Sequence, residues 1–194
     1  MPAREVLKLG DPTLRRVAEV VPFDALRTSE TQRLVDDLID TMHAAHGAGI
    51  AAPQIGASVR IAAVHVRDNP RYPYKPNYPL TVFVNPVLTL LGEAGRDDEW
   101  VYEGCLSVPD LRGLVRRRMR VRCDAYDRHG EPFSVEVSGL TAGTFQHELD
   151  HLDGKLFVDR VEDPTTLTTW ANFDAHHREA FVARARDIVA RWGG

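Results

Sequence analysis

The sequence has little cysteine and no long apolar run. Two cysteines among 194 residues cannot form the disulfide framework of a small secreted protein. No apolar stretch approaches the ~18 residues that a membrane-spanning helix needs. The start of the chain, Met1–Val6, lacks the apolar core of a secretory signal. These absences favour a cytoplasmic protein with no attachment to a membrane.

An excess of positive charge is also absent. The chain carries 24 Lys and Arg against 28 Asp and Glu, a net charge of −4 that argues against stable binding to nucleic acid. Arginines are nevertheless dense between residues 112 and 122, where they alternate with apolar residues in the period of a strand. This alternation predicts a solvated arginine face, with an RNA patch as the alternative, and it points Cys123 inward. The alternating arginines are Arg116, Arg118, Arg120 and Arg122.

Length and periodicity predict a single α+β domain over residues 1–194. Strands fill the middle of the sequence and helices fill its ends. We expect antiparallel strands around a central helix that carries two histidines, followed by a C-terminal helical tail over 164–194. Expected helices cover 29–46, 141–153 and 174–192, and expected strands cover 59–66, 81–91, 115–123 and 133–137.

Three local patterns add detail to this outline. Ser29 and Gln32 have the spacing of a capping box at the start of a helix. Asn85–Pro86 interrupts a strand, which indicates an edge or a bulge. Prolines recur every third residue between 70 and 79, a spacing that favours polyproline II. We predict a stiff surface loop there, with a ligand for an aromatic groove as the alternative.

The strongest chemical signal is His147-Glu148-Leu149-Asp150-His151. Four helical residues bring His147 and His151 within about 40° of each other, so that both imidazoles can bind one metal ion. Glu148 can then reach a water on that ion as a general base. The alternative is an amphipathic helix that contains histidines by chance.

A catalytic site of this type needs a third protein ligand. The metzincin pattern would place a histidine at position 157, but the residue is Phe157. Glu162 and Glu179 lie at the wrong distance from the motif for the ligand of a gluzincin. The ordinary metalloprotease interpretations therefore lack their third ligand.

Cys105 supplies a suitable donor, because a thiolate binds Zn²⁺ or Fe²⁺ strongly. It lies in the segment Glu103–Ser107, after a glycine that permits close approach. A buried structural cysteine is the alternative, and Cys123 fits that description better. A disulfide between the two is disfavoured by the expected reducing compartment. A third segment, Gly47–Gln54, has the small residues of a close-approach loop and ends in an amide donor.

Together these segments resemble the motifs of the peptide deformylase family, G-x-G-[hydrophobic]-A-A-P-Q, E-G-C-L-S and Q-H-E-x-D-H-L. They read here as Gly47–Gln54, Glu103–Ser107 and Gln146–Leu152, in the family's order. The opening Lys8–Arg15 is also similar to that family's start. The resemblance covers roughly residues 5–162.

The resemblance implies an enzyme that hydrolyses the N-formyl group from the initiator methionine of new chains and releases formate. It implies that Cys105, His147 and His151 hold one divalent ion, usually Fe²⁺, with Zn²⁺ or another ion as the alternative in purified protein. Glu148 would accept the proton of the attacking water and deliver it to the leaving amine. The implied partners are nascent formyl-Met peptides, with a transient ribosome contact.

The resemblance also implies roles around the reacting carbonyl. The Gln54 side-chain amide and the Leu106 backbone N–H would stabilise the oxyanion. Gly49 and Arg112 would contact the peptide backbone. Ile50, which replaces the commonest leucine of the motif, would wall the methionine pocket together with apolar helix positions.

Two other functions remain open at this stage. The chain could be a metal-binding scaffold without turnover, but such a protein usually loses the cysteine or Glu148, and both are present. It could also be a zinc endopeptidase that cleaves within chains, which would need an open cleft and no preference for a formyl cap.

Overall fold

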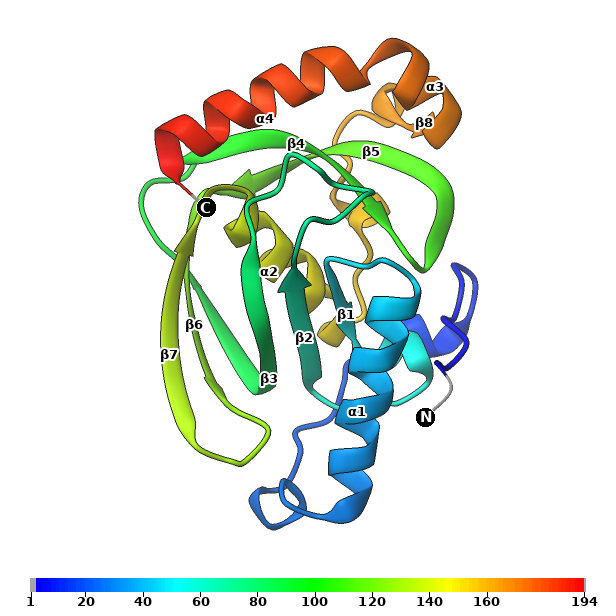
Figure 1. Ribbon diagram of the computed structural model, residues 1–194, viewed down its shortest axis with the longest axis vertical. Helices are drawn as coiled ribbons and strands as arrows, with labels where there is room; N and C mark the ends of the chain where they lie inside the picture. The colour runs from blue at the N-terminus through cyan, green and yellow to red at the C-terminus, as the bar shows by residue number, and fades with distance from the viewer. Residues whose placement is uncertain (1–2, 194) are drawn as a thin grey trace.

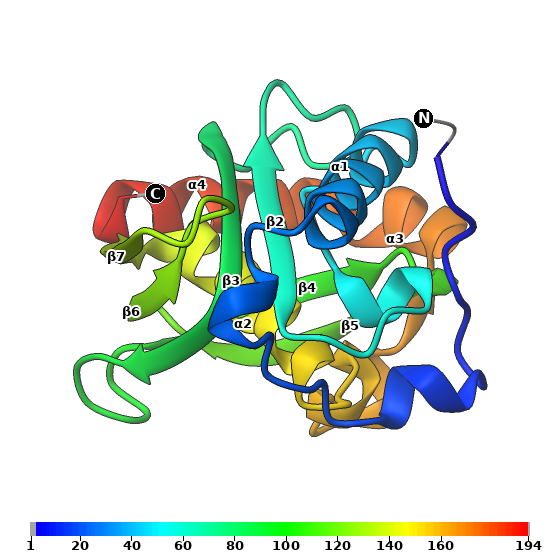
Figure 2. The same cartoon turned by 90° about the horizontal axis from the view of Figure 1, so that it is seen from below.

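A computed structural model describes residues 3–193, so that Met1, Pro2 and Gly194 of the expected domain lie outside the described residues. Two antiparallel sheets pack against the central helix α2, and Figures 1 and 2 show β2 and β3 on one side of it and β4 and β5 on the other. The larger sheet has the order β1-β2-β3-β6-β7 and the smaller has β4-β5-β8. This arrangement confirms the predicted α+β class.

The strands are β1 Gly49–Ala51, β2 Ile61–Val66, β3 Tyr78–Leu90, β4 Asp98–Cys105, β5 Val108–Arg118, β6 Arg120–Tyr126, β7 Pro132–Ser138 and β8 Thr168–Thr169. The helices are α1 Ser29–Ala44, α2 Gly139–Leu152, α3 Trp170–His176 and α4 Arg178–Trp192.

The first helix begins one residue earlier than its predicted capping box. Thr28 is the N-cap, and its side-chain oxygen accepts a hydrogen bond from the Thr31 backbone N–H at 3.3 Å. Gln32 does not reach back to Ser29. Its amide instead donates to the Leu26 carbonyl at 3.0 Å and, across the fold, to the Arg128 carbonyl at 2.7 Å.

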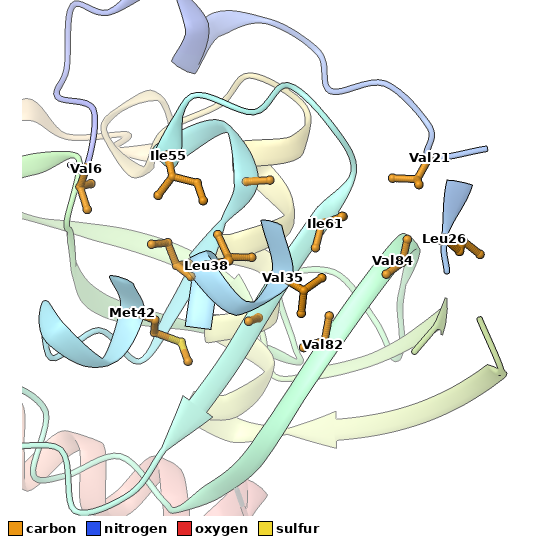
Figure 3. Packing of buried hydrophobic residues seen from close by; sticks show 13 residues of the cluster. Val6, Val21, Leu26, Val35, Leu38, Met42, Ile55, Ile61, Val82 and Val84 are labelled. Carbon is orange, nitrogen blue, oxygen red and sulfur yellow. The ribbon is translucent and has the colours of Figure 1, made fainter. Parts of the chain in front are cut away.

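The apolar stripe of α1 packs onto the larger sheet. Val35, Leu38 and Met42 are fully buried against Ile61 of β2 and Val84 of β3 (Figure 3). Burying each such side chain contributes roughly 1.5–3 kcal/mol to stability. The stripe is therefore core, and it fixes the strand β1 that follows α1 in the chain.

Helix α2 lies at the centre of the molecule and is buried along nearly its whole length. Phe145 packs edge-on against Phe83 of β3 with ring centroids 4.8 Å apart. Leu149 and Leu152 continue this apolar face. Because polar groups are costly to bury without partners, the histidines and acids on its other face must be paired or serve a site.

The arginine-rich segment differs from its prediction. The expected single strand over 115–123 is two strands, since the chain passes from the smaller sheet to the larger one at Met119. This crossing turns Arg118 inward, where its guanidinium pairs with Asp98 at 2.5 Å, so the solvated face predicted for it is wrong. Cys123 is fully buried on β6, as predicted, and β6 pairs with β7 in the expected hairpin.

The proline-rich loop between β2 and β3 lies at the surface, as predicted, but one side of it is buried. Tyr72 is buried, and its ring lies 6.1 Å from that of Trp170 at the start of α3. One side of the loop therefore packs against Trp170, while Pro70, Pro73 and Asn77 stay exposed at the surface, and Figure 2 shows the loop standing out from the body of the molecule. The interruption at Asn85–Pro86 is a bulge in β3, as predicted, and Asn85 adopts a positive φ of 51°.

The C-terminal segment contains two helices where one was expected over 174–192. Helix α3 ends at His176 and α4 begins at Arg178, and β8 before them pairs with β5. Phe173 and Phe181 are buried against the smaller sheet. Within residues 3–193, each helix is too short or too polar to cross a membrane.

Candidate metal centre and catalytic cavity

Three predicted ligands come together between the smaller sheet and the central helix. Cys105 is the last residue of β4, and His147 and His151 lie one turn apart on α2. One donor atom from each of the three lies within 4.8 Å of the others, and all three side chains are buried. The helical spacing predicted the histidine pair, and the antiparallel pairing of β4 with β5 brings the cysteine to it.

The two histidines favour the thiolate form of Cys105. Burial raises the pKa of the Cys105 thiol, but the nearby His151 and His147 outweigh burial and hold that pKa well below its ordinary value. The sulfur lies 3.3 Å from His151 Nε2 and accepts a hydrogen bond from the Ser107 backbone N–H at 3.4 Å. A thiolate is the form that binds metal.

These residues fit a divalent transition-metal ion. One thiolate and two imidazoles are the donors preferred by Zn²⁺ and Fe²⁺. His151 turns Nε2 toward the Cys105 sulfur, 3.3 Å away, so this nitrogen is the one that would share an ion with the thiolate. Two buried imidazoles facing a thiolate leave donor atoms that a cation would satisfy.

Glu103 orients the first histidine. Its Oε2 lies 2.8 Å from His147 Nδ1, and Arg117 donates to the same carboxylate at 2.7 and 3.0 Å. Burial raises the pKa of Glu103, but Arg117 and His147 outweigh it and keep the carboxyl ionised. Arg117 also pairs with Asp150 at 2.7 Å. Sequence reasoning assigned Glu103 no role, although it stands in the segment that contains Cys105.

Glu148 lies beside the ligands without being one of the three. Burial raises the pKa of its carboxyl above the ordinary value. Among the described residues, its Oε2 has no hydrogen-bond partner. A Cβ on Gly49 would lie 2.5 Å from Glu148 Oε1, so only glycine at this position of β1 leaves room for the carboxylate. The acid is thus a buried proton acceptor that faces the cavity.

Gln54 projects its amide toward the same centre. The residue lies in the 3-10 turn Ala52–Ile55, and its Oε1 accepts from the Ala51 backbone N–H at 2.8 Å. This contact orients Nε2, which donates to Ser107 Oγ at 3.1 Å and approaches Cys105 Sγ at 3.5 Å. Ser107, which the sequence reading did not single out, holds the amide in place.

Ile50 and Arg112, which were expected to contact the substrate, do not line the cavity. Ile50 is fully buried in the core beneath α1 and does not line the cavity. Arg112 is also fully buried, with its guanidinium carbon 3.9 Å from the Phe173 ring centroid and Nη2 donating to Tyr74 Oη at 3.0 Å. Aromatic residues of the proline-rich loop and of α3 cover this arginine, so it cannot touch a peptide in this arrangement. The sequence could not predict that Arg112 is covered, because the covering rings come from segments far from it in the chain.

A cavity of about 50 Å³ adjoins the candidate metal centre. Gly49, Gln54 and Leu106 line it, together with the cysteine, His147 and Glu148. The sequence reading did not foresee its other wall, which comes from the proline-rich loop, β4 and α4. That wall includes Tyr72, Tyr74, Lys75, Tyr102 and Phe181.

Comparison with known proteins gives these residues a family context. A model of the polypeptide deformylase family matches residues 3–166. Peptide deformylase 2 of Ralstonia nicotianae is 43% identical over 180 residues, which cover 91% of this chain and 99% of that protein. The peptide deformylase of Heliobacterium modesticaldum is 48% identical over 164 residues, which cover 84% of this chain and 97% of that protein.

Solved structures are similar over the same region. The Met-Ala-Ser-bound class I type b peptide deformylase from Acinetobacter baumannii has a TM-score of 0.76 at 38% identity, covering 82% of this chain and 99% of that one. The peptide deformylase from Legionella pneumophila has a TM-score of 0.71 at 34% identity, covering 98% of this chain and 95% of that one.

Proposed function

This chain belongs to the peptide deformylase family and removes the N-formyl group from nascent polypeptides, and we propose that Cys105, His147 and His151 hold the metal ion on which that reaction depends. The grouping of these three buried donors around one point is the observation that carries the proposal. A bound divalent ion would supply Lewis acidity, lowering the pKa of water toward ~7 and polarising the formyl carbonyl. We propose Fe²⁺ as the native ion, because the soft thiolate suits it and the family motifs imply it.

Glu148 is the proposed general base and general acid. Its carboxylate faces the cavity, and the cationic groups around it, His147, His151 and Lys75, lower its pKa by less than burial raises it. Burial raises the pKa of this carboxyl, which makes it a stronger base for the proton of the attacking water. Glu148 then passes that proton to the amine that leaves as the formyl C–N bond breaks.

Gln54 and Leu106 are the proposed donors to the oxyanion. The Ala51 N–H holds Gln54 Oε1 and Ser107 Oγ holds one N–H of Nε2, so only the second N–H, which lies 3.5 Å from Cys105 Sγ, would turn to the formyl oxygen as charge develops there. Leu106 follows the cysteine directly and lines the same cavity. Gly49 offers its backbone to the peptide at the edge of β1, beside Glu148.

The proposed setting is a cytoplasmic enzyme that meets formyl-Met peptides as they emerge during synthesis. The whole chain would act as one catalytic domain, because Phe181 of α4 lines the cavity together with residues of both sheets and α2. A transient ribosome contact remains a proposal from the family resemblance. An endopeptidase is disfavoured, since the third donor beside the two histidines is Cys105, which neither metalloprotease pattern contains.

The test is formate release from formyl-Met-Ala-Ser by protein purified without oxygen and loaded with Fe²⁺. We expect turnover by the iron form and none by protein stripped with a chelator. Acetyl-Met-Ala-Ser and a peptide blocked at both ends serve as controls, and both should stay intact. Cleavage of the blocked peptide without formate release from the formyl peptide would overturn the proposal.

A further inference from the structure

The proline-rich loop contributes a lysine to the catalytic cavity. Lys75 lines it together with Leu140, Thr144 and Glu148. Its Nζ donates a hydrogen bond to Thr144 Oγ1 at 2.7 Å and lies 5.1 Å from the Tyr72 ring centroid. An ammonium group seldom lies inside a cavity, and here it is attracted by Glu103 and Glu148, the two acids that line the same cavity.

The loop that carries this lysine is anchored on both sides. Before it, Asn69 Nδ2 donates to the carbonyls of His46 and Gly47 at 3.1 and 3.3 Å. After it, the Tyr78 ring lies 5.5 Å from that of Phe145 on α2. These contacts fix where the Lys75 backbone lies, so its side chain reaches the cavity from a defined position.

The lysine meets α2 one turn before the first histidine ligand. Thr144 precedes His147 by three residues, or about 4.5 Å along the helix axis. The Thr144 hydroxyl donates to the Leu140 carbonyl at 3.1 Å, which leaves its lone pairs for the ammonium. Lys75 therefore occupies the part of the cavity where apolar positions of α2 would receive the first side chain of a substrate.

We propose that Lys75 is a specificity-determining residue that limits the size of the first side chain the enzyme admits. The inference rests on the proposed function of the neighbouring site. The remaining cavity of about 50 Å³ holds roughly three to five water-sized groups, enough for a slender side chain such as methionine. A flat aromatic side chain would collide with the lysine stem.

The experiment compares kcat/KM for formyl-Met-Ala-Ser and formyl-Phe-Ala-Ser in the iron-loaded full chain. Lys75→Ala shortens the side chain and should raise the Phe-to-Met ratio about tenfold, the lower end of what a change in pocket size gives. Lys75→Met keeps the length and loses the hydrogen bond, so its ratio should stay near that of the wild type. Lys155→Ala removes an exposed lysine and is the matched control.

The outcomes distinguish a lysine that limits the size of the substrate side chain from a lysine that only anchors the loop to α2. An unchanged ratio in Lys75→Ala overturns the proposal, and so does an equal shift in Lys75→Met, which would assign selectivity to the hydrogen bond. A purely structural tether would lower thermal stability and activity toward both peptides together. If Lys75→Ala does not fold, Lys75→Val takes its place. Absence of formate release by the wild type would instead overturn the proposed function.

Discussion

His147 Nδ1 and Glu103 Oε2 are 2.8 Å apart, and this contact ties a proposed metal ligand to a buried ion pair with Arg117. The carboxylate fixes the ring and its tautomer, which leaves the other nitrogen for the metal. Arg117 in turn bridges to Asp150 on the same helix. The ligand is therefore oriented by β4, β5 and α2 together.

Glu103→Gln should weaken metal binding by about 10–100-fold while the fold is kept. The amide can still contact the ring, but it loses the charge that pairs with Arg117. Metal affinity is measured by competition with a chromogenic chelator, with circular dichroism to check the fold. Glu131→Gln on the exposed hairpin turn is the control. Unaltered affinity would show that Glu103 does not support the ligand.

Glu148→Gln should retain the metal and lose turnover by about 10²–10⁴-fold. Glutamine fits the space beside Gly49 but cannot accept the proton of the attacking water. Metal content by elemental analysis and formate release on the same sample separate the two properties. Normal metal content with activity within threefold of the wild type would contradict the assigned role.

The two cysteines should respond differently to serine. Cys105→Ser should release the ion or change which ion is retained, because serine is a poor ligand for soft metals. Cys123 is fully buried on β6, where burial raises its pKa to about 12 and keeps the thiol neutral. Cys123→Ser should therefore keep its metal and activity. Metal loss from Cys123→Ser alone would reverse the assignment.

Gln54→Ala should lower kcat by about 100-fold with little change in KM. An oxyanion donor acts in the transition state, and removing one costs about 2.7–4 kcal/mol in other enzymes. Steady-state kinetics and a thermal melt on the same variant are needed. A joint loss of metal and melting temperature would assign Gln54 to packing, and an effect on KM alone would make it a positioning residue.

Lys75 should make stability rise with pH in the alkaline range. Burial is the largest cause that lowers its pKa, to about 8, although Glu103 and Glu148 oppose the shift. The unfolded chain, with an ordinary lysine pKa near 10.4, then binds more protons than the folded chain between these values. The buried charge destabilises the fold below pH 8, and the cost disappears as pH rises.

Urea unfolding of the wild type and Lys75→Met at several pH values tests this expectation. The variant should be the more stable protein at pH 7, and its advantage should shrink toward pH 10. The comparison removes the contributions of other groups that titrate in the same range. A pH-independent difference between the two proteins would contradict the buried-charge explanation.

Short-range sequence patterns predicted the residues of the candidate metal centre. The direction of Arg118 and the lining of the substrate pocket depend on long-range packing, which such patterns do not show. His147 and His151 share a helical face by spacing alone, and Cys105 stands in a compact motif. The burial of Arg118 could not be predicted from strand alternation. It arises because the chain passes from one sheet to the other at Met119, which turns this side chain toward Asp98.

The same limit applies to the substrate pocket. Arg112 is covered by rings from α3 and from the proline-rich loop, segments whose approach no local pattern reveals. Ile50 lies one residue from Gly49 in a strand, so neighbouring side chains point to opposite faces and it enters the core instead of the cavity.

Phe181 contributes to the cavity wall from α4, beyond the 3–166 segment that the family model matches. Its ring lies 5.1 Å from Tyr74 and 5.6 Å from Tyr102, so three aromatic side chains from separate segments form one surface. An inhibitor that only binds metal would engage residues shared across the family. A compound that also stacks on Phe181 would draw part of its affinity from α4, so its binding would depend on how that helix is docked as well as on the metal.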